Sequence, residues 1–492
     1  MNKNFKIIFF CGILFFTVSN VLAQQQEYIT VTGEKGIGKT VNGEMVREFV
    51  GNVVLTQGNI RVTCDQAIQY ISRNDAELIG NVVATQDTLT ITTSHAFYYG
   101  NQKMAESNSG VMLNDKKVIL TADTGIYYFD LNKAIFNSNV KLFDTASTLT
   151  SDKLTYFKED GKAIAVRRVK IVESKNIIKA DSLIHFRDSR ITYAFNNVRI
   201  SDTSKSSFIY GDHLEDYPSK SYSLIDKNPL YIQIDTSYVK EVDTLSPGKN
   251  DTSIVMQLDT LVIKAKKMEA YRDTINIFKA EDSVEIVRGA FASRNDYTVY
   301  YRSKQEIVTD RLNRESPQPI IWYENSQLTG DSVTITLREN KIRKLTVNRN
   351  AFLLSQNEKY RKRFDQLSGS KIIIYFNDNG IDLTEVFGGV HSIYYLYEDN
   401  SPNGLTKSSA ESAKIFFENK KVSTVKLFGT PTSEYYPENK VEGSELAFTL
   451  PGYILYNNRP QKNELLSTLK DKENFIMNSK ANSFKLRHTI NK

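Results

Sequence analysis

The sequence predicts an all-β protein built from stacked repeats, and three observations support this. A valine recurs in phase every 29 residues, as Val53, Val82, Val111, Val140, Val169 and Val198. Further along most repeats, every second residue is mostly apolar, and this period of two is typical of β-strands with one apolar face. Helical periodicity is nearly absent, apart from a weak pattern over 464–476.

The composition fits a globular β protein. Of the 492 residues, 40% are hydrophobic and 11% aromatic, with 27 Tyr and 26 Phe against one Trp. Tyr and Phe favour strands, and this content is enough for a sizeable core in more than one domain. The net charge of +6 is mild for this length, so nothing suggests a nucleic-acid partner.

Residues 1–23 have the pattern of a signal peptide. Lys3 and Lys6 precede an apolar run over 7–18, and Val21-Leu22-Ala23 supplies the small-residue pattern for cleavage. We therefore expect an exported mature chain that begins at Gln24 and has no transmembrane segment. Its only cysteine is Cys64, which excludes an intrachain disulfide.

Each repeat carries a second alternating block about a dozen residues after its valine. In the first repeat the block spans 60–70, and in the fourth it slips by one residue, which suggests a bulge. Stacked units of this kind form an elongated structure whose inward faces join into an apolar strip. This strip is a core if two sheets pack shut, or a trough for acyl chains if they splay apart, and periodicity leaves both open.

An aspartate recurs inside this block, and four repeats share it as Asp65, Asp123, Asp152 and Asp181. One hypothesis is a ladder of metal-binding carboxylates. The other, which we prefer, is a turn or outward-facing polar residue that sets the strand register. The five histidines show no ligand spacing with one another or with cysteine, so we expect neither a metal site nor a cofactor.

The chain is expected to divide near its middle. We predict a β-repeat domain over 24–235, a linker or long loop over 236–258 and a second β-repeat domain over 259–460, because 236–258 is rich in Thr, Ser and Asp. A weakly helical tail follows over 461–492.

Two further motifs carry weak signals. Residues 33–40 have the spelling of a phosphate-binding P-loop, but no helix pattern follows to complete such a site. The basic runs Arg361-Lys362-Arg363 and Lys420-Lys421 could touch lipid phosphates, although such runs are more often solvated surface.

The segment from Gly51 to Ala67 resembles the repeat of the OstA-like (organic solvent tolerance, LptA-like) lipopolysaccharide-transport family. It contains Gly-Asn-Val, a Gln-Gly turn, an alternating strand and Asp-x-Ala, and 76–82 matches the start of the next family repeat. The resemblance implies a β-jelly-roll, or β-taco, whose interior takes the acyl chains of lipid A. It also implies lipopolysaccharide and other transport proteins, joined by edge-strand pairing, as partners. The expected location is the periplasm, with or without association with the outer membrane.

We therefore predict a non-catalytic periplasmic lipid-binding module that carries or bridges lipopolysaccharide toward the outer membrane. The alternative is a structural or adhesive β-solenoid with a closed core. A polysaccharide-acting β-helix enzyme ranks last, because the aspartates lack accompanying cations at a matching period. The residues predicted to line the trough are Val62, Ile68, Tyr70, Ile91, Phe97, Tyr99, Leu120, Ile126 and Tyr128.

Overall fold

The computed structural model describes residues 27–469 except 42, 203, 205, 244–250, 340 and 420. The chain forms two compact units. Unit one contains the described residues up to Val111 together with Ile126–Leu131, and unit two contains Met112–Gly125 and the described residues from Asn132 onward. The signal peptide expected at 1–23 lies outside the described residues.

Both units consist of antiparallel strands, as the repeat pattern predicts. Unit one contains β1 to β7 and most of β10. The bounds of these strands are β1 Thr30–Thr32, β2 Lys35–Val41, β3 Glu44–Gln57, β4 Ile60–Tyr70, β5 Asp75–Gln86, β6 Leu89–Tyr99, β7 Met104–Ser107 and β10 Thr124–Tyr128.

Unit two contains the remaining strands and the short helices. In chain order the strands are β8 Val111–Asn114, β9 Ile119–Ala122, β11 Lys133–Phe143, β12 Ser147–Phe157, β13 Lys162–Glu173, β14 Asn176–Phe186, β15 Ile191–Asp202, β16 Ser207–Tyr217, β17 Tyr222–Asp226, β18 Leu230–Asp243, β19 Asp251–Lys264, β20 Lys267–Tyr271, β21 Ile277–Arg288, β22 Phe291–Tyr301 and β23 Glu306–Asp310.

The carboxyl-terminal part of unit two continues the same architecture. Its strands are β24 Ile320–Tyr323, β25 Ser326–Thr329, β26 Ser332–Arg338, β27 Lys341–Gln356, β28 Phe364–Asn377, β29 Gly380–Glu398, β30 Ser401–Glu418, β31 Lys421–Phe428 and β32 Thr432–Tyr436. The helices are η1 Pro218–Lys220, η2 Arg302–Lys304, α1 Glu438–Val441, η3 Glu445–Ala447 and α2 Lys462–Leu466.

A sharp bend divides the long strands into two arms. In β3 the bend is made by Gly51 and Asn52, which have φ values of 83° and 44°, and in β15 by Asn196 and Asn197 at 59° and 49°. The register of β3 against β4 jumps here, since Val50 pairs with Gln66 and Val53 pairs with Cys64. Two residues of one strand therefore face one residue of the next, which is a β-bulge.

We call the two parts of each bent strand arm one and arm two. Arm one starts at the repeat valine, as in 53–57 and the paired 60–64. Arm two lies on the other side of the bend, as in 44–50 and the paired 66–70. The six valines are 0–7% exposed, so the predicted phase is confirmed: every repeat turns its valine inward immediately after the bend.

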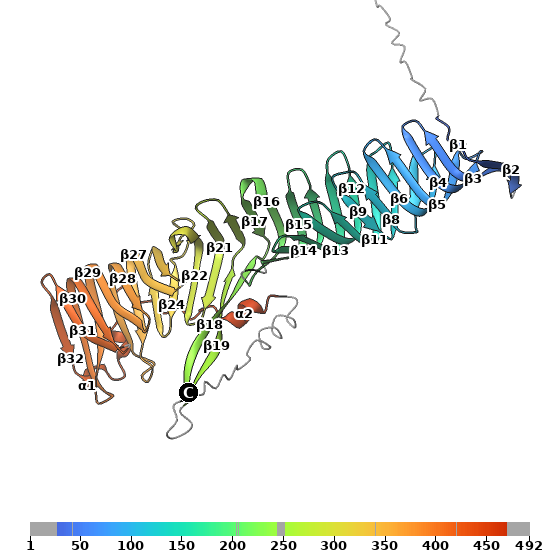
Figure 1. Cartoon of the computed structure of the whole chain (residues 1–492). Helices are drawn as coiled ribbons and strands as arrows, with labels where there is room; N and C mark the ends of the chain where they lie inside the picture. Colours follow the sequence, from blue (N-terminus) through green and yellow to red (C-terminus); the bar gives the residue numbers. More distant parts are fainter. Residues whose placement is uncertain are drawn as a thin grey trace, which may run out of the picture. The chain divides into compact units, whose positions relative to one another are not determined.

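The prediction of a linker or long loop over 236–258 is wrong for the described residues of that segment. Residues up to Asp243 continue β18, those from Asp251 form β19, and the backbones of these strands pair from Leu230–Lys264 to Asp243–Asp251. Figure 1 shows this hairpin extending away from the neighbouring strands. Polar composition was misleading because a two-stranded hairpin needs no apolar core to satisfy its backbone groups.

The division into two domains at this hairpin stays a prediction, although the compact units divide near residue 111. The expected helical tail over 461–492 contains the short helix α2, and the rest of it from residue 470 lies outside the described residues.

Residues 437–469, which we call the strap, cover the outer face of arm one in the carboxyl-terminal part of unit two. The Gln366 amide bonds the Phe448 carbonyl and the Leu450 N–H at 2.9 and 2.8 Å. Gln327 does the same with the Ile454 carbonyl and the Tyr456 N–H, both at 2.8 Å. Leu465 packs into the buried cluster around Trp322, so both faces of this arm are covered.

We predict that Gly80→Ala destabilises the bend between the arms. Gly80 has φ +73°, and an added Cβ would lie 2.3 Å from Oδ2 and 3.0 Å from Cβ of Asp65. The expected loss is about 1–3 kcal/mol of unfolding free energy, measured by urea denaturation of the mature protein. Gly110→Ala is the matched control, because Gly110 has φ +74° with no heavy atom within 4 Å of the added Cβ. Equal losses in the two variants would contradict the steric part of this prediction.

A second prediction concerns a desolvated carboxyl group on β28. Burial raises the pKa of Asp365 to about 7, and the N–H of Tyr395 bonds its carboxylate at 2.9 Å. The folded state therefore holds this proton more tightly than the unfolded state, so Asp365 lowers stability as the pH rises from about 4 to about 7. In Asp365→Asn this loss disappears while the acceptor oxygen is kept. Urea midpoints at pH 5 and 8 should fall less in the variant than in the parent, and equal falls would exclude this role.

Candidate functional site: the apolar interior and its mouth

The interior between the two arms is filled by the side chains of the chain itself. In unit one, arm one contributes Val53, Leu55 and Val62 at 0–1% exposure. Arm two contributes Leu78 and Tyr98, also at 0–1% exposure. Because large side chains from both arms are fully buried, the two inner faces pack against each other in this conformation.

The nine predicted lining residues lie on two opposite faces. Val62, Ile91 and Leu120 are buried on the inner face of arm one, at 1%, 7% and 0% exposure. The other six belong to arm two, where they alternate with buried neighbours and point away from the interior; they are Ile68, Tyr70, Phe97, Tyr99, Ile126 and Tyr128. Phe97 is 37% exposed. The assumption that all nine share one face is therefore wrong.

The reason is the bulge, which shifts the alternation by one residue in every repeat and not only in the fourth. The buried residues of β4 are Ile60, Val62 and Cys64 before the bend, then Ala67 and Gln69 after it. Sequence reasoning missed the inner residues of arm two because Ile68 and Tyr70 are more apolar than Ala67 and Gln69. In the first repeat Ala67, two residues after Asp65, is the first inward residue after the bulge, and Ala96 holds the same place in the second repeat.

The recurrent aspartates stabilise the bend. Asp65, Asp123 and Asp181 each accept a hydrogen bond from the amide of an asparagine 16 residues later, at 2.9, 2.7 and 2.6 Å. In the fourth repeat Asp152 instead pairs with Arg168 at 2.6 Å, which lowers the pKa of Asp152. The outward orientation expected for these aspartates is confirmed, since Asp65, Asp123 and Asp181 are exposed. No cluster of potential metal ligands occurs among the residues that the structure describes.

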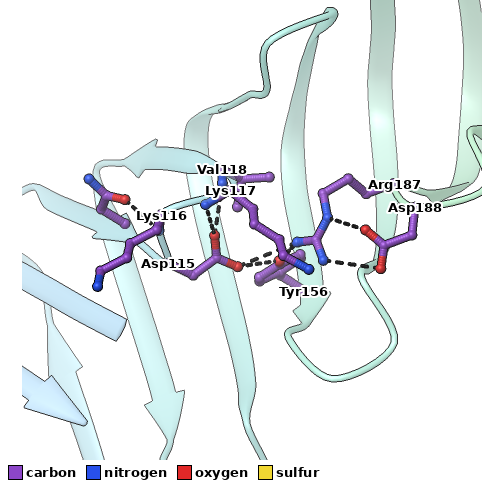
Figure 2. Close-up of polar contacts among 8 residues, drawn as sticks. Asp115, Lys116, Lys117, Val118, Tyr156, Arg187 and Asp188 are labelled. Atoms are coloured by element: carbon purple, nitrogen blue, oxygen red, sulfur yellow. Dashed lines mark hydrogen bonds and ion pairs between the residues drawn. The ribbon is translucent and has the colours of Figure 1, made fainter. Parts of the chain in front are cut away.

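Polar side chains join the tips of the two arms at the mouth of the interior, opposite the bends. In unit two Asp115 follows β8 at an arm-one tip, and Tyr156 lies at an arm-two tip (Figure 2). The Tyr156 hydroxyl donates to Oδ2 of Asp115 at 2.6 Å and accepts from Nη1 of Arg187 at 2.5 Å. Tyr156 is 1% exposed and Asp115 is 5% exposed, so this clasp excludes water.

The Asp115 carboxylate also fixes its own turn, which holds it at the mouth. Its other oxygen, Oδ1, accepts the backbone N–H groups of Lys117 and Val118 at 2.9 and 2.8 Å. Figure 2 also shows Asp188 beside Arg187, and their ion pair spans 2.9 Å. Burial, followed by the bond to Asp115, raises the pKa of the Tyr156 hydroxyl, so Tyr156 remains a donor at neutral pH.

Unit one has a clasp of the same kind. The Tyr98 hydroxyl donates to Oε1 of Gln57 at 2.5 Å, and the Gln57 amide donates to the Gly100 carbonyl at 2.9 Å. In both clasps the arm-two tyrosine lies 41 residues after its arm-one partner. The two clasps therefore repeat one design, in which a buried tyrosine of arm two bonds a tip of arm one.

Other candidate features do not form sites. Residues 35–41 of the P-loop spelling form the exposed strand β2 and lead to no helix. Burial raises the pKa of Cys64 to about 11, which disfavours a nucleophilic thiolate. In the basic run at 361–363, Arg363 is 4% exposed and pairs with Glu438, so it cannot meet a ligand. No helix in the described ranges is long and apolar enough to cross a membrane.

Comparison with known proteins finds a family match in the first part of the chain. Residues 25–181, about a third of the chain, match the family described as OstA-like protein. The predicted resemblance is thus confirmed for the region that contains the regular repeats.

The chain is also similar to the crystal structure of LptH from Pseudomonas aeruginosa, the LptA homologous periplasmic component of the conserved lipopolysaccharide transport device. The identity is 14% over 34% of this chain and 82% of that chain, with a TM-score of 0.12. No curated protein matches the chain.

We predict that Tyr156→Phe weakens the clasp without disturbing the packing of the ring. Without the hydroxyl, Asp115 and Arg187 keep only their direct contact at 3.5 Å. The variant should therefore lose about 1–2 kcal/mol of unfolding free energy. Urea denaturation measures this change. In the control Tyr193→Phe, the removed hydroxyl contacts only that of Tyr217 at 3.2 Å on the outer face, and the loss should be smaller. An equal loss of unfolding free energy in the control would show that the Tyr156 hydroxyl contributes no more to stability than a hydroxyl on the outer face.

Proposed function

We propose that this protein is a non-catalytic carrier of lipopolysaccharide, whose acyl chains occupy the interior between the arms after the clasps open. The observation that carries the proposal is the OstA-like match over 25–181, in a segment that the structure folds into two arms facing a shared apolar interior. Burial of acyl chains between the arms would supply about 25 cal/mol per Å² of apolar surface.

The inner faces suit such a ligand chemically. In unit one, the buried residues of arm one include Val53 and Val82, and those of arm two include the small residues Ala67 and Ala76. Acyl chains need no hydrogen bonds, so a wall of aliphatic side chains is sufficient to hold them. The polar groups of the mouth are used by the clasps, which gives the empty carrier a closed state with its apolar surface covered.

Edge strands offer a way to join partners, as the resemblance implies. All seven residues of β2 are exposed, and its backbone pairs with β3. A strand with a free edge can receive a strand from another protein. We place the mature protein in the periplasm, where such a partner and the lipid would both be available.

The closed-core alternative keeps one specific observation in its favour, namely the complete burial of the inner side chains. A structural solenoid would keep this packing permanently. The two functions therefore differ in one measurable property: whether lipid reaches the inner face of a folded, exported protein.

A photo-crosslinking pair on β6 tests the proposal. Ile91 is 7% exposed on the inner face, whereas Phe97 is 37% exposed on the outer face of the same strand. A photo-reactive residue at 91 should capture lipopolysaccharide in cells, and one at 97 should capture several-fold less. Ile91→Asp should abolish lipid that co-purifies with the protein, as detected by mass spectrometry. Exported, folded protein that never captures lipid at 91 would favour the closed core.

A further inference from the structure

The outer surface of the arm-two tips has a regularity that the carrier function does not explain. Several strands that end at these tips finish on an aromatic residue. In unit two they are β12, β14, β16, β20 and β22, and their last residues are Phe157, Phe186, Tyr217, Tyr271 and Tyr301. We call these five residues and the turns that follow them the lip. In unit one, Tyr70, Tyr99 and Tyr128 occupy the equivalent positions.

The rings form a nearly continuous row on the outer face of arm two. Phe186 contacts Tyr193 with centroids 6.3 Å apart, and Tyr193 contacts Tyr217 at 6.0 Å. Tyr217 and Tyr222 stack at 6.1 Å, and Tyr222 lies 5.0 Å from Tyr271. These five rings, of Phe186, Tyr193, Tyr217, Tyr222 and Tyr271, are half-buried. Within the described residues α1 contacts β30 and α2 contacts β19, so neither helix covers this row.

Lysine ammonium groups lie over the same rings. Lys162 lies 5.8 Å from the ring centre of Phe157 and 5.7 Å from that of Phe186. Lys220 lies 5.1 Å from Tyr217, and Lys304 lies 5.4 Å from Tyr301. Such cation–π contacts at exposed sites are weak, about 0.5–1 kcal/mol, so they leave the ammonium groups available to a stronger anionic partner.

The charge of the lip is positive. The turns 158–161, 187–190, 218–221, 272–276 and 302–305 contain seven Lys and Arg against four Asp and Glu. Two nearby carboxylates already have cationic partners: Glu269 pairs with Lys267 at 2.9 Å, and Asp216 pairs with Arg272 at 2.8 Å. Over the described ranges, Lys162, Lys220 and Lys304 form no ion pair with a carboxylate, so their charge remains available.

We propose that the lip binds the phosphorylated sugar headgroup of the lipid whose acyl chains lie between the arms. This inference rests on the proposed function and deepens it by assigning the headgroup site. The faces of a sugar ring are apolar and can pack on tyrosine and phenylalanine rings. Phosphate groups on the sugar can form ion pairs with the lysine ammonium groups. The lip lies at the mouth, so a headgroup that leaves the interior passes over it.

Binding of a headgroup probe without acyl chains tests the lip separately from the interior. The probe is deacylated lipopolysaccharide, titrated into the mature protein by isothermal calorimetry. The triple variant Lys162→Gln, Lys220→Gln, Lys304→Gln should bind it about tenfold more weakly. Removal of the phosphates from the probe should weaken binding to the parent protein to a similar degree.

A matched control separates the lip from general attraction between charges. Lys141, Lys170 and Lys179 are exposed on the outer face of arm one, where Lys170 and Lys179 are paired neighbours. Changing these three to Gln removes the same charge and should alter the affinity less than twofold. Equal weakening in both triple variants would overturn the lip as a site and leave only non-specific electrostatics.

Two further outcomes are decisive. Phe186→Leu keeps an apolar side chain but loses the ring face, and it should weaken probe binding several-fold. Vesicles of phosphatidylglycerol and phosphatidylethanolamine should not compete with the probe, and full competition would assign the lip to a membrane surface instead. Lipid capture at position 91 with no probe binding would contradict only the proposal that the lip binds the headgroup. Probe binding without lipid capture would instead contradict the proposed carrier function.

Discussion

The bend inside each long strand is the constraint on which the rest of the structure depends. Two consecutive residues with positive φ, such as Gly51 and Asn52, oppose one residue of the next strand, here Asp65. Side-chain alternation therefore shifts by one residue at every bend. Since the strand also changes direction there, the shifted alternation keeps apolar side chains inward on both arms. Without the shift, one arm would present its polar face to the interior.

The bend also explains why polar residues recur where they do. Asp65 and its equivalents bond the asparagine side chains of the next bend, and this ties each repeat to its neighbour. At the opposite end of the strands, polar side chains join the arms. Tyr98 and Tyr156 join the arms through short hydrogen bonds to Gln57 and Asp115. The protein thus has a fixed ridge and a mouth that is closed by a few hydrogen bonds.

The two arms differ in what lies outside them. In the carboxyl-terminal part of unit two, the strap covers arm one through Gln327, Gln366 and Leu465, which makes it a three-layer structure there. The outer face of arm two instead carries aromatic rings with lysines above them. A covered arm resists bending more than an uncovered one, because its strands pack on both faces. Opening of the mouth in that region would therefore move arm two.

The sequence by itself determined the strand class, the 29-residue repeat and the inward phase of Val53 and its equivalents, because these follow from local alternation and regular spacing. It also placed Val62, Ile91 and Leu120 inside. Only the tertiary structure decided the faces of Ile68, Tyr70 and Phe97, since a bulge of one residue reverses the alternation and leaves hydrophobicity unchanged. The clasps and the strap were equally hidden, because they join residues such as Gln57 and Tyr98, or Gln366 and Leu450, whose proximity depends on how the arms and the chain end pack.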